Sequence, residues 1–215
     1  MTLLRVPRAP WKFAGAAAVG LACLLPLAAQ AADGLTAQVV DGRGRPLANA
    51  VVYAMPATGR APAVAAGTTF AIDQIDREFV PMVSAIQAGT QVRFPNKDDV
   101  EHDVYSFSAA KRFEIKLYSG VPSKPVLFDK AGLVVLGCNI HDSMVAYVLV
   151  VDTPYFGRTD KSGRVSFDNL PPGNYKVAAW HYTMREPNAQ PSSSAQWAAG
   201  AAPPALKFTL AIEGS

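Results

Sequence analysis

The sequence is poor in the residues that most often carry chemistry. Its 215 residues include only two cysteines and three histidines, and 17% of them are charged. Half of the residues are hydrophobic, which excludes extensive disorder. No window has the pattern of a long amphipathic helix, whereas 16 glycines and 17 prolines favour many turns between short strands.

The chain also lacks an excess of charge of one sign. Its formal net charge of +3 comes from Arg5, Arg8 and Lys12 at the start of the sequence, and the remainder holds 17 basic and 17 acidic residues. A domain that binds nucleic acid usually has a clustered basic surface. We therefore expect no nucleic-acid partner.

The first 31 residues have the pattern of a signal peptide. Three cations in residues 1–12 precede an apolar run over 13–28, and an Ala-Gln-Ala sequence ends at Ala31. The alternative, a retained membrane anchor, is less favoured because Pro26 interrupts a run that is short of the ~20 residues needed to span a bilayer. Lipidation at Cys23 is a minor alternative. We expect cleavage after Ala31, export to the periplasm and no stable membrane association afterwards.

Short segments rich in valine, threonine and aromatic residues alternate with turn residues through the rest of the chain. This pattern predicts an all-β protein built of one or two sandwiches. The expected strands are Leu35–Val40, Ala50–Ala54, Thr90–Pro95, Asp103–Phe107, Lys111–Leu117, Pro125–Phe128, Leu133–Cys138, Val145–Val151, Val165–Phe167, Asn174–Trp180 and Leu206–Ile212.

Removal of the leader leaves Cys138 as the one cysteine, and it lies in a Cys-x2-His-x2-Met sequence with His141 and Met144. A second histidine, His102, occurs 36 residues upstream. One thiolate, two imidazoles and a weak thioether form the ligand set of a blue-copper site, with three strong ligands in a plane and a long axial methionine. We therefore predict one copper ion bound by these four residues.

Each of these residues also has an ordinary structural interpretation. Cys138 alone would be a small buried apolar residue at a strand end, and Met144 alone a core residue. Their combination at ligand spacing favours the metal site. A Cys138–His141 nucleophile is an alternative, but no third orienting group is evident, and we expect no enzyme activity. The third histidine, His181, has no such neighbours, and we expect no metal there.

The segment around this motif resembles a cupredoxin, and the Cys-x2-His-x2-Met loop is most like that of the amicyanins. The approach to His102 over Phe79–Asn96 resembles the family too, and the chain as a whole resembles exported proteins of the methylamine-utilisation or plastocyanin-like type. The resemblance implies His102, Cys138 and His141 as equatorial ligands and Met144 as the axial one. It also implies that Asn96, Asp103 and Asn139 lie beside the site, where Asp103 and Asn139 could hydrogen-bond and tie two loops together. Cupredoxins usually have asparagine at the position of Asp103, and a carboxylate there would favour Cu(II).

Two distant segments, Gly34–Pro56 and Gly157–His181, resemble the carboxypeptidase regulatory-like (transthyretin-like) β-sandwich in their turn glycines and apolar positions. The resemblances together imply an all-β chain that combines a cupredoxin Greek-key sandwich with a smaller transthyretin-like sandwich. The expected parts are a signal peptide over 1–31, the first piece of the smaller sandwich over 34–64, the cupredoxin over 65–152, and the remainder over 153–215 with a flexible loop over 187–205.

The function that we expect is single-electron transfer in the periplasm. The electron would leave through His141, and the acidic residues Asp98, Asp99, Glu101, Asp103 and Asp142 would attract a basic redox partner. These acidic residues have an equally simple interpretation as a solvated loop face. Two other functions stay open, namely copper handling and a β-sandwich interaction module whose metal site is structural or vestigial.

Overall fold

The computed structural model describes residues 34–122, 124–168, 170–187, 190–198 and 201–214. Every regular element in these ranges is a β-strand, so the predicted all-β class is correct. Among the same residues no helix is long and apolar enough to cross a membrane. The expected signal peptide and its cleavage position lie outside the described residues.

Ten strands between residues 69 and 151 form the first sandwich. They are β3 (Thr69–Ala71), β4 (Asp73–Ile75), β5 (Glu78–Val80), β6 (Val83–Gln87), β7 (Thr90–Arg93), β8 (His102–Ser108), β9 (Lys111–Tyr118), β10 (Val126–Phe128), β11 (Gly132–Gly137) and β12 (Val145–Val151). One sheet has the order β6-β12-β11-β8-β9, a second has the order β10-β7-β3, and β4 and β5 form a separate hairpin.

The core of the first sandwich lies between its two larger sheets. Val134 and Leu136 on β11 are fully buried in this core, whereas Val135 between them is 37% exposed on the other face. The alternation follows from the two-residue period of a strand. Phe94 and Phe128 contribute to the same core from the side of the smaller sheet. The metal-binding motif therefore follows a strand that is anchored by buried residues.

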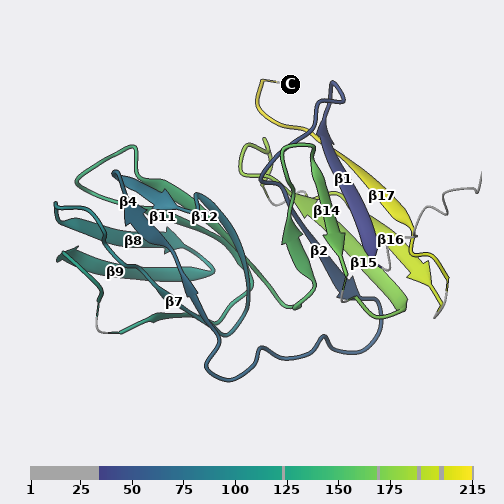
Figure 1. Ribbon diagram of the computed structural model, residues 1–215, viewed down its shortest axis with the longest axis horizontal. Coiled ribbons are helices and arrows are strands. Elements are labelled where there is room, and N and C mark those ends of the chain that lie inside the picture. The colour runs from purple at the N-terminus through teal and green to yellow at the C-terminus, as the bar shows by residue number, and fades with distance from the viewer. Residues whose placement is uncertain (1–33, 123, 169, 188–189, 199–200, 215) are drawn as a thin grey trace, which may run out of the picture. The chain divides into compact units, whose positions relative to one another are not determined.

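The remaining strands form a second sandwich. They are β1 (Leu35–Asp41), β2 (Val51–Pro56), β13 (Phe156–Arg158), β14 (Arg164–Phe167), β15 (Gly173–Trp180), β16 (Ser192–Trp197) and β17 (Ala205–Leu210). Figure 1 shows β1 between β14 and β17 in a three-stranded sheet, and β13-β2-β15-β16 forms the facing sheet. Strands from before residue 57 thus pair with strands from after residue 155. The domain boundaries and the transthyretin-like assignment remain predictions.

The expected loop over 187–205 was partly wrong, because β16 lies within it. Strand β16 pairs antiparallel with β15 over six residues, from Ser192↔Ala178 to Trp197↔Gly173. Ala195 is only 3% exposed and belongs to the core of the second sandwich. The serines that resemble a linker in sequence occupy an edge strand, where short polar side chains are tolerated because one face and one edge are open to water.

Candidate metal centre

Three potential ligands converge at one end of the first sandwich. The side chains of His102, Cys138 and His141 place ligand atoms within 4.8 Å of one another, and this is the one such group found among the described residues. Cys138 Sγ lies 4.0 Å from Nδ1 of His102. Nδ1 of His141 lies 3.2 Å from the same nitrogen. Residues that are 36 and 39 positions apart in the chain thus face one point.

The strand pairing explains this convergence. His102 is the first residue of β8, and Cys138 directly follows β11, which runs antiparallel to β8. The end of one strand and the start of the other therefore lie at the same end of the sheet. His141 lies in the turn that follows, and the amide of Met144 donates a hydrogen bond to the His141 carbonyl at 2.9 Å before β12 begins.

Gly137, the residue before Cys138, has no room for a side chain. A Cβ atom there would lie 2.6 Å from Cζ of Tyr105, because the tyrosine ring covers this position. The motif thus enters the site beside an aromatic ring on the neighbouring strand β8.

The proposed ligands differ in exposure. His102 is fully buried, Cys138 is 3% exposed and Met144 is 1% exposed, whereas His141 is only partly buried. Cys138 and Met144 belong to the apolar core of the first sandwich, and Cys138 is a free thiol. The site is therefore shielded from water on the side of Cys138 and opens toward the surface at His141.

Asp98 orients the buried imidazole. Its Oδ2 lies 2.8 Å from Nε2 of His102, which leaves Nδ1 of the ring facing Cys138 and His141. The backbone amides of Asp76 and Arg77 donate to the same carboxylate at 2.7 and 2.9 Å. Burial raises the pKa of Asp98, but the hydrogen bonds from Arg77, His102 and Asp76 outweigh that effect and hold the pKa below its usual range.

The sequence analysis did not predict that Asp98 orients His102. It placed Asp98 in a group of acidic residues that either attract a redox partner or form a solvated loop face. The side chain of Asp98 is 11% exposed and its oxygens are occupied. The sequence did contain one signal for this role, because Asp98 lies four residues before His102. Metal-bound histidines usually donate their second N–H to a carboxylate or carbonyl.

Asp103 and Asn139 join the two ligand-bearing segments. The amide of Asn139 donates to Oδ1 of Asp103 at 2.6 Å, and the Asn139 side-chain amide donates to Oδ2. Asp103 is 4% exposed, so it too does not belong to a free acidic surface. These are the hydrogen bonds that the cupredoxin resemblance implies.

Asn96 shapes the loop that leads to His102. Its side-chain amide donates to the carbonyls of Val100 and Tyr118 at 2.8 and 3.0 Å, and its oxygen accepts from the Asp98 amide at 3.0 Å.

The sequence analysis did not predict that Tyr118 lies near the site. Burial raises the Tyr118 pKa to about 12 against an opposing effect of the hydrogen bond with Gln74, and Cys138 and Asp103 add smaller upward effects. The Tyr118 hydroxyl donates to the Phe94 carbonyl at 2.7 Å.

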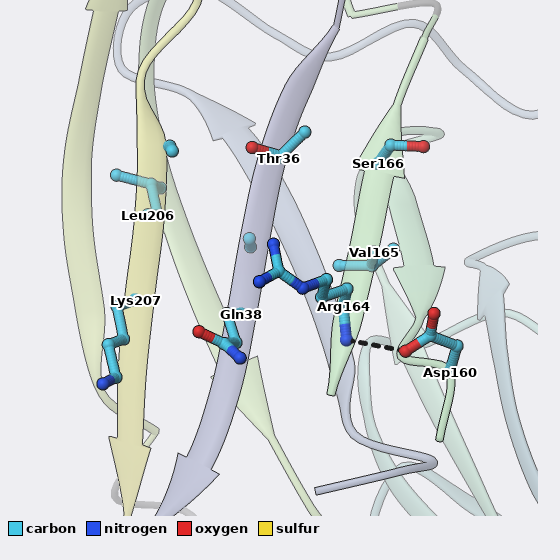
Figure 2. A pocket seen from close by; sticks show the side chains of 10 residues that line it. Thr36, Gln38, Asp160, Arg164, Val165, Ser166, Leu206 and Lys207 are labelled. Carbon is cyan, nitrogen blue, oxygen red and sulfur yellow. Dashed lines mark hydrogen bonds between the residues drawn. The ribbon is translucent and has the colours of Figure 1, made fainter. Parts of the chain in front are cut away.

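Other features lie outside this cluster. A hollow of about 480 Å³ lies over the outward face of β14, β1 and β17, where Figure 2 shows Thr36, Gln38 and Arg164 among the lining side chains. It contains neither histidine nor cysteine. The ring nitrogens of His181 lie 2.7 Å from the Thr183 hydroxyl and 3.1 Å from the Ala48 carbonyl. Among the residues that the structure describes, the potential metal ligands thus cluster at His102, Cys138 and His141.

No protein-family model and no curated protein matches the chain. Solved structures of copper proteins are similar to part of it. The copper-containing nitrite reductase of Thermus scotoductus is 23% identical with a TM-score of 0.37, and the match covers 45% of this chain and 25% of the reductase. A mutant amicyanin in its Cu(I) form is 18% identical (TM-score 0.35, 46% of this chain and 99% of amicyanin), and a purple cupredoxin from Nitrosopumilus maritimus is 21% identical (TM-score 0.33, 39% and 99%). Because these TM-scores lie below 0.5, we infer the chemistry of the site from its own side chains and not from these similarities.

Proposed function

We propose that this chain is a type 1 copper protein of the cupredoxin kind that transfers single electrons in the periplasm and catalyses no reaction on a substrate. The observation that carries the proposal is the convergence of Cys138 Sγ with Nδ1 of His102 and Nδ1 of His141 within 4.8 Å. A soft thiolate together with two imidazoles is the equatorial donor set of a blue-copper site.

The residues fit copper in chemistry and in preorganisation. His102, Cys138 and His141 would hold the ion, and Met144 would serve as the weak axial ligand. Bound copper would alternate between Cu(II) and Cu(I) and so take up and release one electron. The protein would hold the donor atoms in place through Asp98 on His102 and the Asp103–Asn139 hydrogen bonds. A fixed donor set limits the rearrangement that accompanies a change of oxidation state.

Exposure indicates where the electron would enter and leave. His141 is the least buried of the proposed ligands, and its neighbour Ile140 is 52% exposed. Asp99, Glu101 and Asp142 lie around the loops that carry the ligands, and their side chains reach solvent. We therefore propose a redox partner with a basic surface that docks at His141. The acidic rim formed by these three residues would act mainly by raising the association rate.

The visible absorption spectrum of the purified protein with one equivalent of Cu(II) tests this function. We expect an intense thiolate-to-copper charge-transfer band that ascorbate bleaches and that a Cys138→Ser variant lacks. A matched control is His181→Asn, which changes a histidine outside the cluster and should keep the band. A folded wild-type protein without this band would overturn the proposal.

A further inference from the structure

We propose that the β4–β5 hairpin is a positioning element of the metal centre, because its tip holds the Asp98 carboxylate that in turn fixes the His102 ring. The inference rests on the proposed function in so far as His102 is a copper ligand. The hairpin itself contributes no candidate ligand to the cluster found among the described residues.

The two residues at the tip of the hairpin, Asp76 and Arg77, both have left-handed backbone conformations, with φ of 55° and 60°. They connect Ile75 to Glu78, which face each other across the hairpin. Two consecutive positive φ values are the geometry of a type I′ turn, which asparagine and glycine favour. Here non-glycine residues adopt it, and both of their amides point at Asp98, one to each carboxylate oxygen.

The body of the hairpin is fastened to the segment that precedes Asp98. The Gln74 amide donates to the Pro95 carbonyl at 2.8 Å, and the Lys97 amide donates to the Gln74 carbonyl at 2.9 Å. The Lys97 ammonium also lies 2.6 Å from Asp73 Oδ2. The hairpin thus contacts the backbone beside Asp98 as well as its side chain.

The buried side chain of Gln74 extends this connection toward the site. Its amide donates to the hydroxyl of Tyr118, the residue that pairs with His102 across β8 and β9. Gln74 is fully buried and its Oε1 has no partner, so the side chain is held there without complete hydrogen bonding. The hydrogen bond from Gln74 therefore connects β4 to the residue opposite His102.

The consequence for His102 is a defined ring orientation and tautomer. Asp98 Oδ2 accepts a hydrogen bond from the ring when Nε2 carries a proton, and in the neutral ring the lone pair is then on Nδ1, the nitrogen that faces Cys138 and His141. A carboxylate acceptor also makes the imidazole a stronger donor to a metal. Loss of the hairpin contacts would leave Asp98 free to turn away from the ring.

The first test uses the metal-free protein and compares Asp98→Asn with the matched control Asp99→Asn. Both variants remove one negative charge, but it is Asp98 whose carboxylate accepts the hydrogen bonds of the hairpin amides and lies against His102, whereas Asp99 is exposed. Long-range ¹H–¹⁵N NMR of the imidazoles should show a single Nε2–H tautomer of His102 in the wild type and in Asp99→Asn. Asp98→Asn should give a mixture of tautomers. The same mixture in both variants, or in neither, would overturn the role of Asp98.

The second test separates the hairpin from Asp98. The double substitution Asp76→Asn with Arg77→Gly keeps both amides in a favourable type I′ turn and should retain the wild-type tautomer. Inserting one glycine between residues 76 and 77 moves the amides and should reproduce the Asp98→Asn spectrum while the strands of the sandwich stay folded by circular dichroism. An insertion variant with the wild-type tautomer would refute the role of the hairpin.

The copper-loaded protein provides a third measurement. Asp98→Asn should raise the midpoint potential more than Asp99→Asn does, because it replaces a charge-assisted hydrogen bond to a ligand by a weaker neutral one and also removes a charge. Equal shifts of the midpoint potential in the two variants would mean that Asp98 acts only through its charge, which would contradict its positioning role. Failure of the wild type to develop the charge-transfer band would instead contradict the proposed function, whereas the tautomer measurement in the metal-free protein would still decide the role of the hairpin.

Discussion

Substitution of Met144 tests most directly whether this residue binds copper or only adjusts its reduction potential. It is buried in the same core as Cys138, and leucine has a similar volume, so Met144→Leu should cost less than about 1.5 kcal/mol of stability. If the thioether is the weak axial ligand, its removal should raise the reduction potential while copper remains bound. Voltammetry together with metal analysis checks this, and complete loss of copper would contradict an axial role.

His181 should make stability depend on pH. Burial lowers its pKa, against a smaller opposing effect of the hydrogen bond with the Ala48 carbonyl. The folded state therefore binds this proton more weakly than the unfolded state does, so the stabilisation is present at neutral pH and declines as pH falls below the usual histidine pKa of about 6.5. Thermal unfolding between about pH 5 and pH 8 should show a shallower pH dependence for His181→Asn than for the wild type. The same pH dependence of the unfolding temperature in both proteins would contradict a contribution of His181.

At the scale of single residues, the sequence was enough to predict that His102, Cys138 and His141 meet and that Asp103 bonds to Asn139, but not that Asp98 holds the His102 ring. Cys138, His141 and Met144 share one short motif, and His102 is one of only two further histidines, so few combinations existed. Apart from its position four residues before His102, little in the sequence separates Asp98 from Asp99, because the loop decides where each side chain points. The loop is set by hydrogen bonds from Asn96 and from the hairpin, which depend on three-dimensional pairing rather than on local sequence.

Among the structural elements, the turn between β13 and β14 gives the sharpest prediction for stability. Gly163 has a φ of 71°, and a Cβ atom there would overlap the Val39 carbonyl oxygen on β1. Gly163→Ala should therefore destabilise the protein by more than the roughly 1 kcal/mol expected for conformation alone. Gly44→Ala is the matched control, because Gly44 has a φ of 81° and open space around it.

Urea unfolding of the two glycine variants measures this difference. Equal midpoints for Gly163→Ala and Gly44→Ala would show that the turn can move away from β1. The comparison also tests the close approach of this turn to β1, where the Val39 amide donates to the Gly163 carbonyl at 2.8 Å.

The strands that could be predicted are those with a clear apolar pattern, and most of the missed ones are very short or polar. All eleven expected strands occur, with ends that differ by one or two residues. The three-residue strands β4 and β5 are too short to show a period, and their pairing depends on the turn at Asp76–Arg77. Strand β16 carries serines that are typical of linkers, and only its pairing with β15 defines it.

For the whole molecule, the acidic rim predicts salt-dependent electron transfer. Asp99, Glu101 and Asp142 reach solvent, whereas Asp98 and Asp103 are occupied by hydrogen bonds. The second-order rate constant with a basic redox protein should fall as ionic strength rises, because salt screens exposed charges over about 10 Å at ~0.1 M. Glu101→Lys should lower the rate at low salt without changing the visible spectrum. A rate independent of salt in stopped-flow measurements would contradict docking at this rim.

The position of β1 favours an order of folding. Its neighbours are β14 and β17, which begin at residues 164 and 205, so both edges of this strand stay unpaired until distant parts of the chain reach it. The apolar residues Leu35 and Val39 on this strand are fully buried in the folded protein, but they stay exposed until the sheet is complete. All strands of the first sandwich end by Val151. The strands around the candidate metal site can therefore pair with one another before the strand over 35–41 has met either of its neighbours.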